Sequence, residues 1–216
     1  MNASRRGRGT SAGLSRESIV AAGTRVARRL GLSNVSLRLV AQELDVTPAS
    51  LYNHMADKEE LIDAIADAFI RDLLEQPLPA DPMRRIRELV TRLHRAGIDQ
   101  PGMLSNTVGH IPEMSGSAQM AYAEQMLAAL IEAGASEPQA HVLYRLLVTV
   151  AVGDSVAAAN LRAPRRRPLQ DRVADRIADA GPLTARYLAR HPSGHRDDIS
   201  AHLDFILRDL PTEPEA

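Results

Sequence analysis

The chain has 216 residues, and its 26 Lys and Arg nearly balance 27 Asp and Glu, for a formal net charge of −1. It contains no cysteine, which excludes disulfides, thiol nucleophiles and cysteine-based metal sites. The length allows a sizeable core, and we see no apolar run of the roughly 18 residues that a membrane span needs. We therefore expect a cytoplasmic protein with no membrane partner.

Basic charge is concentrated at the N-terminal end. Residues 1–56 hold eight arginines against three acidic residues, a net of +5, whereas the rest of the chain carries a net of −6. This distribution suits contact with phosphates, which supply most of the non-specific affinity of DNA-binding proteins. For Arg25, Arg28 and Arg29 the alternative is that they only solvate the outer face of a helix.

The first segment, residues 1–13, is rich in Arg, Ser and Gly and is predicted to be a disordered basic arm. Its three arginines suit the minor groove or phosphates; alternatively, they only keep the tail soluble.

A first helix is predicted from Ser15 to Leu30, with Gly31 ending it. Its role is to pack on the next two helices, because a two-helix unit cannot bury enough apolar area alone.

A pattern of two short helices joined by a tight turn follows. Ser36 is expected to cap the first helix by offering its hydroxyl to free backbone amides, and apolar residues recur at helical spacing through Leu44. Thr47 is a second capping residue and Pro48 suits the first helical position, so a second helix is predicted to run to about Met55. This is a helix-turn-helix pattern, in which the second helix enters the DNA major groove.

The run GLSNVSLRLVAQELDVTPASLYNHMADKEEL has a Leu-Tyr-X-His core at residues 51–54 followed by Lys58, and it resembles the DNA-binding region of the TetR family of bacterial repressors. The resemblance is strong over residues 15–62. Beyond them the chain is more loosely similar to the regulatory domain of tetracycline-repressor-like members. The resemblance implies an all-α fold with a three-helix DNA-binding domain over residues 14–57, joined by a long helix to a helical effector-binding and dimerisation domain over residues 58–216.

The resemblance also implies, position by position, which residues contact DNA. Those at the start of the second helix or facing bases are Thr47, Pro48, Ala49, Ser50 and Asn53. Those suited to phosphate contact are Tyr52, His54, Lys58 and Arg38, the last of which also matches guanine. Serine can bond to several base edges, asparagine matches adenine, and a Pro or Ala surface suits thymine methyl groups. For Tyr52 the alternative is a core aromatic residue.

The rest of the chain is predicted to be helical. A long helix starts at Lys58, capped by Asp57, and is the natural lever between the two domains. Further helices are expected from Pro82, within Gln100–Ser117, over Ala118–Ala133, about His141–Asn160, Pro182–His191 and Arg196–Leu210. The His141–Asn160 helix is the most apolar, with Leu146 and Leu147 among the residues expected inside. We expect two C-terminal helices to meet their symmetry mates in a four-helix homodimer interface; alternatively, both pack within the monomer.

Site chemistry points away from an enzyme. We find no Gly-rich phosphate loop, HExxH or GxSxG, and expect neither a cofactor nor a metal. In tetracycline repressors a histidine near the place of His110 helps hold a magnesium-bound drug, but Leu74, Val90 and Met126 stand where that subgroup has polar drug contacts. A more apolar effector fits better. Its expected contacts are Leu74, Val90, Met103, Met114, Met126 and Leu147, with His94, Asn106 and His110 as orienting polar groups; plain core is the alternative for each.

Together these features indicate a homodimeric transcriptional repressor that binds a palindromic operator in double-stranded DNA. A small-molecule effector would release it by favouring another placement of the Lys58 helix. Two alternatives stay open. One is a constitutive DNA-binding protein whose second domain only dimerises, and the other is a small-molecule enzyme or carrier that retained the fold.

Overall fold

The structure is a computed structural model, and it describes residues 14–104, 116–162, 181–183, 185–186 and 199–210. Its elements are α1 (Arg16–Leu30), η1 (Leu32–Asn34), α2 (Leu37–Glu43), α3 (Pro48–Leu51), α4 (Lys58–Leu74), α5 (Pro82–Asp99), α6 (Pro101–Leu104), α7 (Ser117–Glu132), α8 (Glu137–Arg162) and α11 (Ser200–Leu207). Every regular element in these ranges is helical, which confirms the predicted all-α class. The helix expected over Pro182–His191 lies mostly outside the described residues.

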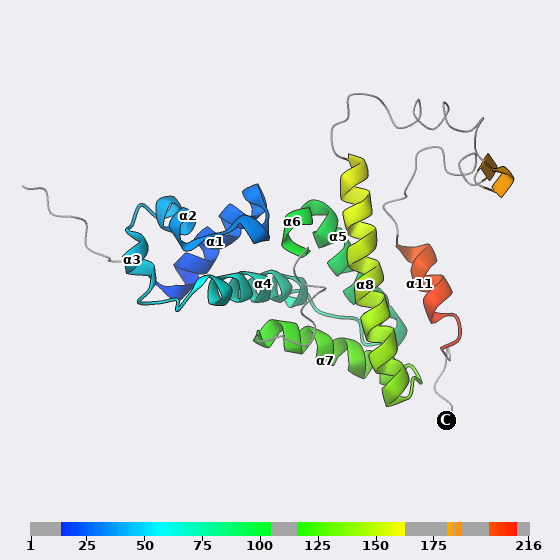
Figure 1. Cartoon of the computed structure of the whole chain (residues 1–216). Helices are drawn as coiled ribbons and strands as arrows, with labels where there is room; N and C mark the ends of the chain where they lie inside the picture. The colour runs from blue at the N-terminus through cyan, green and yellow to red at the C-terminus, as the bar shows by residue number, and fades with distance from the viewer. Residues whose placement is uncertain (1–13, 105–115, 163–180, 184, 187–198, 211–216) are drawn as a thin grey trace, which may run out of the picture.

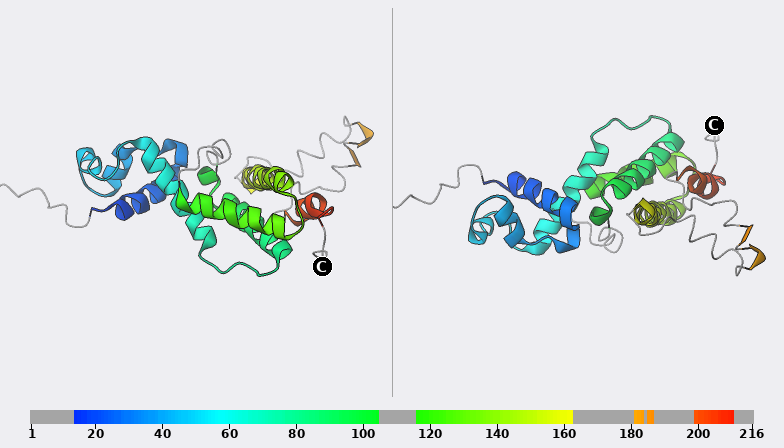
Figure 2. Two further views of the ribbon diagram at one scale, coloured as in Figure 1. Left: turned by 90° about the horizontal axis from the view of Figure 1, so that it is seen from below. Right: turned by 90° about the horizontal axis from the view of Figure 1, so that it is seen from above.

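The helices form an elongated body. Figure 1 shows α1, α2 and α3 gathered at one end and α8 and α11 at the opposite end, with α4 running between them. The two perpendicular views in Figure 2 show the same order along the long axis. The regions predicted to bind DNA and to dimerise therefore lie at opposite ends of the molecule.

Local signals in the sequence set both ends of α1. The Ser15 hydroxyl accepts a hydrogen bond from the Ser18 amide at 3.2 Å, and the Ser18 hydroxyl accepts one from the Ser15 amide at 2.9 Å. This reciprocal capping satisfies amides that the first turn leaves free. Gly31 ends the helix in a left-handed conformation, with φ of 86°, which glycine adopts without steric cost. The predicted bounds of the first helix are confirmed.

The connection from α1 to α4 depends on close packing. Gly23 in α1 lies where a Cβ would come within 2.6 Å of the Ile65 side chain in α4, so a larger residue would force that side chain to move. Asp57 caps α4 by accepting a hydrogen bond from the Glu60 amide at 2.8 Å. Helix α4 packs on both α1 and α7. This helix thus joins the N-terminal helices to the remainder.

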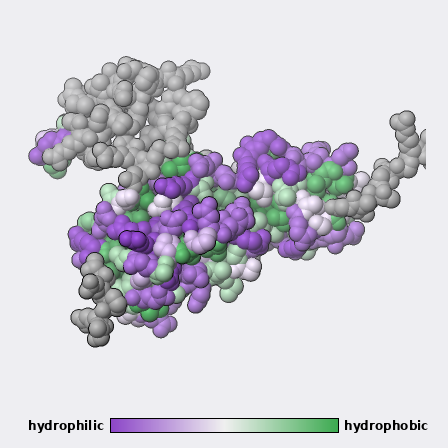
Figure 3. All heavy atoms as spheres, turned by 180° about the vertical axis from the view of Figure 1, so that it is seen from behind, coloured by the Kyte–Doolittle hydropathy of each residue, from purple (hydrophilic) through white to green (hydrophobic). Residues whose placement is uncertain are grey.

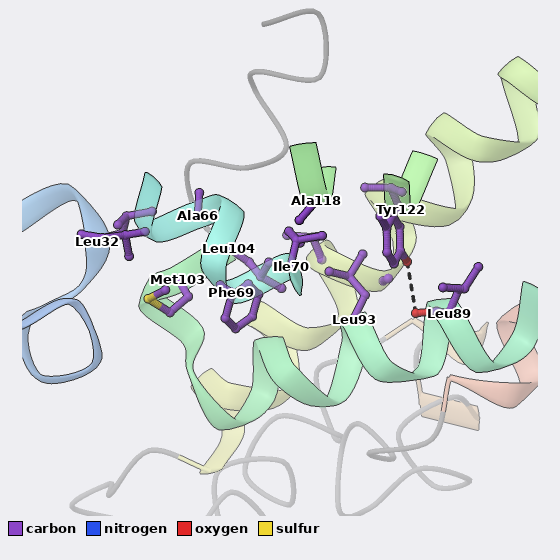
Figure 4. Packing of buried hydrophobic residues seen from close by; sticks show 14 of the residues in the cluster. Leu32, Ala66, Phe69, Ile70, Leu89, Leu93, Met103, Leu104, Ala118 and Tyr122 are labelled. Carbon is purple, nitrogen blue, oxygen red and sulfur yellow. Dashed lines mark hydrogen bonds between the residues drawn. The ribbon is translucent and has the colours of Figure 1, made fainter. Parts of the chain in front are cut away.

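The larger part of the fold is built from α5, α7 and α8, which pack on one another. Figure 4 shows Phe69 and Ile70 of α4 and Leu93 of α5 pointing toward the same apolar interior. In that interior the Tyr122 hydroxyl donates a hydrogen bond to the Leu89 carbonyl at 3.1 Å. Burial raises the pKa of Tyr122, because ionisation would place a charge in an apolar environment. Its single proton therefore serves to tie α7 to α5.

The central helix of this group, α8, is unusually apolar. The stretch Glu137–Ala159 is long and apolar enough to cross a membrane by length and composition, with a hydropathy of 1.6. The expectation that the chain has no such run is therefore wrong for this helix, because its apolar residues continue past the scattered charges Arg145 and Asp154. In the fold, α8 packs along α5 and α7, and its inward side contributes the buried residues Leu147 and Ala151 to the core.

The outward side of α8 is also apolar. Val142 is 66% exposed and Leu146 is 42% exposed, so the expectation that Leu146 lies inside is wrong; it lies one position before Leu147, on the other side of the helix. At helical spacing the exposed row continues as Thr149, Gly153 and Ala157. On α11, Phe205 is 66% exposed. Elsewhere, Figure 3 shows hydrophilic residues over much of the described surface seen from behind, with hydrophobic ones in patches.

Candidate DNA-binding and effector sites

Helix α3, the predicted recognition helix, has one buried side and one exposed side. Leu51 and Met55 are fully buried, with 0% and 1% of their surfaces exposed. The side chains predicted to contact DNA lie on the other side. Arg38, Thr47, Pro48, Ala49, Tyr52, Asn53 and Lys58 are exposed, and Ser50 and His54 are half-buried. The structure therefore brings all nine predicted DNA-binding residues to accessible positions on or next to the helix-turn-helix.

The turn between α2 and α3 differs in detail from the prediction. Ser36 caps α2 as expected, accepting a hydrogen bond from the Leu39 amide at 3.3 Å. Thr47 occupies the capping position of α3 but makes no side-chain cap bond; its hydroxyl instead lies 2.9 Å from the Ser50 hydroxyl. Asp45 takes a left-handed φ of 54°, which a short polar side chain tolerates better than a bulky one. The predicted capping role of the Thr47 side chain is wrong.

The predicted length of the second helix is also wrong. Helix α3 ends at Leu51, because the amides of His54 and Met55 both bond to the Leu51 carbonyl, each at 2.9 Å, and close the chain into a turn. Asn53 therefore lies on this turn and not within a regular helix. A sharp turn is needed here because Asp57 adopts an extended conformation to cap α4 two residues later.

Two exposed side chains flank α3. Tyr52 is 58% exposed, so the alternative that it is a core aromatic residue is wrong. Lys58 is exposed at the start of α4, and its Nζ donates a hydrogen bond to the Ser33 carbonyl at 3.3 Å. This bond is weak and solvent-exposed, so the ammonium group is available to a nearby anion.

The arginines of α1 have defined protein partners. Arg25 and Arg29 both bind the Glu43 carboxylate of α2, at 3.0 and 3.1 Å. The hydrogen bonds from Arg25 and Arg29 hold the pKa of Glu43 below its ordinary value. These contacts fix the angle between α1 and α2, so both arginines have a structural role beyond solvating the helix surface. Arg28 points elsewhere and donates to Gln100 Oε1 at 2.9 Å.

A second pair ties the start of α1 to the start of α4. The Arg16 guanidinium binds the Glu60 carboxylate, which also accepts a hydrogen bond from the Ala56 amide. The bond from the Ala56 amide and that from Arg16 lower the pKa of Glu60. The Glu60 carboxylate thus reaches the amide one residue before the capping residue Asp57. It closes the loop between α3 and α4.

The candidate effector residues other than His94 fall into three groups. Val90, Met103, Met126 and Leu147 come from α5, α6, α7 and α8, are at most 1% exposed, and belong to one hydrophobic cluster. Leu74, at the end of α4, is half-buried and packs against that cluster. The remaining apolar and polar candidates Asn106, His110 and Met114 lie outside the described residues. The described apolar candidates are therefore gathered in space, and whether they contact an effector stays a prediction.

The polar candidate His94 is already engaged. Its Nε2 lies 2.7 Å from Asp154 Oδ2, joining α5 to α8, and the two side chains are 1% and 6% exposed. A buried polar pair of this kind is stable only when both groups are hydrogen-bonded. Asp154 was not singled out in the sequence, although an acidic residue within such an apolar helix is a signal for a buried partner. An effector would meet the imidazole together with this carboxylate.

Comparison with known proteins identifies the N-terminal unit. Residues 19–65 match the family described as bacterial regulatory proteins, tetR family; they span most of α1, the helix-turn-helix and the first half of α4. The tetracycline repressor protein of class G from Vibrio anguillarum is 29% identical over 68 residues. Residues 19–65 therefore belong to the tetR family of bacterial regulatory proteins. The match to the class G repressor spans 32% of this chain and 32% of that protein, about a third of each.

Solved structures of TetR-family proteins resemble the whole chain. Apo ActR from Streptomyces coelicolor has a TM-score of 0.75 and 20% identity over 92% of this chain and 95% of that chain. ActR in complex with actinorhodin has a TM-score of 0.74 and 20% identity, covering 91% and 96%. BioQ with its double-stranded DNA operator has a TM-score of 0.60 and 24% identity, covering 84% and 99%. At these identities the likeness shows the fold.

The sequence did not predict the structural role of one buried acidic residue. Asp67 lies on α4, is 7% exposed, and accepts a hydrogen bond from the Ala118 amide of α7 at 2.7 Å. A signal was present, because Asp67 interrupts the buried series Ile65, Ala66, Phe69 and Ile70. An acidic residue there needs a buried donor, but the sequence does not say that α7 supplies it.

The structure also has an open groove of about 1110 Å³ between α1 and α4. Its lining includes Arg25 and Arg28 of α1, Glu59, Asp67 and Asp72 of α4, and Gly116 and Ser117 at the start of α7. None of the predicted effector residues within the described ranges lines this groove. It is therefore a separate feature from the apolar cluster in which Met126 and Leu147 lie.

Proposed function

We propose that this TetR-family regulator is a homodimeric repressor that binds a palindromic operator and is released by a small apolar molecule. One observation carries the proposal: α3 exposes Ser50 and its neighbours above a fully buried anchor, Leu51. A recognition helix needs this combination, because base discrimination requires side chains held rigidly at the groove floor. The predicted DNA-binding domain, residues 14–57, is proposed as the operator-reading unit, with the basic residues 1–13 adding contacts to DNA.

In the proposed complex, α3 enters the major groove. Ser50 and Asn53 bond to base edges, and the small apolar surface of Pro48 and Ala49 suits thymine methyl groups. Lys58, Tyr52 and the other polar residues at the ends of α3 contact phosphates and fix its register. The Arg25–Glu43 and Arg29–Glu43 pairs support this arrangement by holding α1 against α2.

Two such units must lie about 34 Å apart to read successive major grooves. We propose that a dimer achieves this through α8 and α11. The exposed side of α8 carries Val142 and Leu146 followed by the smaller Gly153 and Ala157, a surface that allows close helix approach. Phe205 adds an exposed apolar side chain on α11. Residues 58–216 would thus form the dimerisation and effector-binding domain of a cytoplasmic protein.

For the effector we propose the cluster of Val90, Met103, Met126 and Leu147, with His94 as a polar contact. ActR, which shares this fold, has been solved with actinorhodin, and a cluster formed by α5 to α8 offers an apolar molecule the environment that such ligands need. The effector must bind more tightly to the form that does not bind the operator. By linkage, the operator then weakens effector binding by the same factor.

Operator selection tests the proposal. The purified full chain is incubated with random DNA duplexes, and the enriched sequences are retested with Ser50→Ala and Asn53→Ala. A palindrome is expected, and each variant should lose about 1–3 kcal/mol of discrimination at one base pair of each half-site. Ser33→Ala and Gln42→Ala, both exposed on neighbouring segments, are matched controls and should retain the parent's preference.

Other outcomes would support the competing functions. If no sequence is enriched at low salt, where phosphate contacts are strongest, DNA binding is wrong and a small-molecule carrier or enzyme becomes the better proposal. If the palindrome is enriched but no compound in an apolar library releases it, the protein acts as a constitutive DNA-binding protein.

A further inference from the structure

We propose that Asp67 is a positioning residue that locks the middle of α4 to the start of α7 and thereby sets the spacing of the two recognition helices. The inference rests on the proposed function, because that spacing matters only in a DNA-binding dimer. It assigns to one polar contact, between α4 and α7, a part in linking the core helices to the DNA-binding end.

One oxygen of the Asp67 carboxylate bonds to α7, and the other bonds to a residue of its own helix. Oδ1 accepts hydrogen bonds from the amides of Ala118 at 2.7 Å and Gln119 at 3.3 Å. Oδ2 accepts a hydrogen bond from the Arg71 guanidinium at 2.6 Å, one turn further along α4. Bonds to an ionised acceptor are shorter and stronger than neutral ones. The contact is therefore directional in a way that the surrounding apolar packing is not.

Helix α7 depends on this carboxylate for its first turn. Its own capping residue, Gly116, has no side chain and supplies no cap bond, so Asp67 fills that role from another helix. The N-terminus of a helix carries a partial positive charge that favours a carboxylate. Gly116 also makes room for it, since a Cβ there would lie 2.6 Å from Asp67 Cγ. Both sides of the contact are thus built for close approach.

The position of Asp67 along α4 allows a movement of α7 to reach the N-terminal helices. It follows Lys58 by nine residues, which is about 14 Å along the helix axis at 1.5 Å per residue. Nearer the Lys58 end, Leu61 and Ile65 of α4 lie beside Gly23 of α1, while Asp67 bonds to the first turn of α7. Since α7 also carries Met126 and Tyr122 in the core, a shift of α7 would be passed through Asp67 to α4 and so to α3.

Spin-label distances in the full-length dimer test this link. The chain has no cysteine, so Gln42→Cys on the exposed side of α2 provides one labelling site per protomer. Asp67→Asn keeps the size of the side chain but removes its charge. We expect the distance between the two labels to broaden and its centre to move by about 2 Å or more, and operator affinity to fall by roughly fivefold or more.

A matched control is Asp72→Asn, an exposed acid on the same helix, which should leave both readouts unchanged. If Asp67→Asn gives the same distances and affinity as Asp72→Asn, the proposal is overturned, even if the melting temperature falls, because a merely structural role would lower stability alone. If Asp67→Asn does not fold, Gly116→Ala displaces the same carboxylate from the α7 side and must produce the shift. A parent protein that gives no interprotomer distance or no operator binding would overturn the proposed function and, with it, this inference.

Discussion

The backbone of Gly102 in α6 packs directly on that of Gly31 at the end of α1: a Cβ on Gly102 would lie 2.6 Å from the Gly31 Cα. Next to this contact, Arg28 donates a hydrogen bond to Gln100 at 2.9 Å. The N-terminal helices are therefore held to the larger part of the fold at a second place besides α4. The nearest atoms that a Cβ on Gly102 would meet are all backbone atoms of Gly31, which cannot move aside as a flexible side chain could.

Gly102→Ala should separate α6 from α1. Because the obstructing atoms are backbone, the added methyl group should lower the free energy of unfolding by about 1–3 kcal/mol, as overpacking does elsewhere. Chemical denaturation of the purified variant measures this loss. Ser33→Ala, in the exposed part of η1 beside the contact, should unfold like the parent. Equal stability of Gly102→Ala and the parent would show that the two segments do not pack this closely.

The buried pair of His94 and Asp154 makes a prediction about stability. Because His94→Ala leaves the Asp154 carboxylate in the core without its imidazole partner, it should cost about 3–5 kcal/mol. The double variant His94→Leu with Asp154→Leu should cost less than the sum of the two single changes, since it leaves neither member of the pair buried without the other. A double-mutant cycle by denaturant unfolding gives the coupling free energy. Strictly additive effects would contradict the contact.

Glu60 makes a prediction about pH. Folding lowers its pKa from the ordinary value of 4.5, through the Ala56 amide and then Arg16, so its carboxylate stabilises the folded state fully above that value. The contribution is lost as the pH falls through the lowered folded-state pKa. Glu60→Gln should therefore lower the melting temperature at pH 7 and converge with the parent at a pH below that lowered pKa.

Melting curves between these two pH values measure the effect. Glu59→Gln, the exposed neighbour on the same helix turn, serves as the control and should keep the parent's pH dependence. A Glu60→Gln curve parallel to that of the parent across the whole range would contradict the role assigned to the carboxylate.

The proposed dimer predicts which surface changes break association. Leu146→Glu and Phe205→Glu each place a charge on the exposed apolar sides of α8 and α11 and should convert the dimer to monomer, because a charge desolvated at an interface without a partner is costly. Sedimentation velocity measures the mass. Met120→Glu alters a side chain that is 60% exposed on α7 and should leave the dimer intact. A dimer that survives both Leu146→Glu and Phe205→Glu must use another surface.

Helix positions followed well from the sequence because their signals are local. The first helix begins at Ser15 and Ser36 caps α2 as expected, and Gly31 and Gly134 take the positive φ values that end helices. Thr47 shows the limit of such signals. Its hydroxyl had two available partners, an amide of α3 and the Ser50 hydroxyl, and only the folded geometry decides between them.

Contacts between distant helices could not be obtained in the same way. The spacing of apolar residues indicated that α8 has a buried face, but both of its sides are apolar, so Leu146 was placed inside although it is exposed. The sequence likewise gave no partner for Asp67 or Asp154. Pairing an acid with a donor 51 or 60 residues away depends on how helices cross, which one sequence does not specify.

Lys58 is the only lysine in the chain, and it is exposed at the start of α4 beside Ser33. Apart from the terminal α-amine, an amine-reactive reagent therefore has one target in the entire protein. That target lies where a DNA phosphate is predicted to bind. Acylation of this one ammonium group would remove its charge, so the protein has a natural chemical reporter whose protection would measure occupancy of the DNA-facing surface without any engineered label.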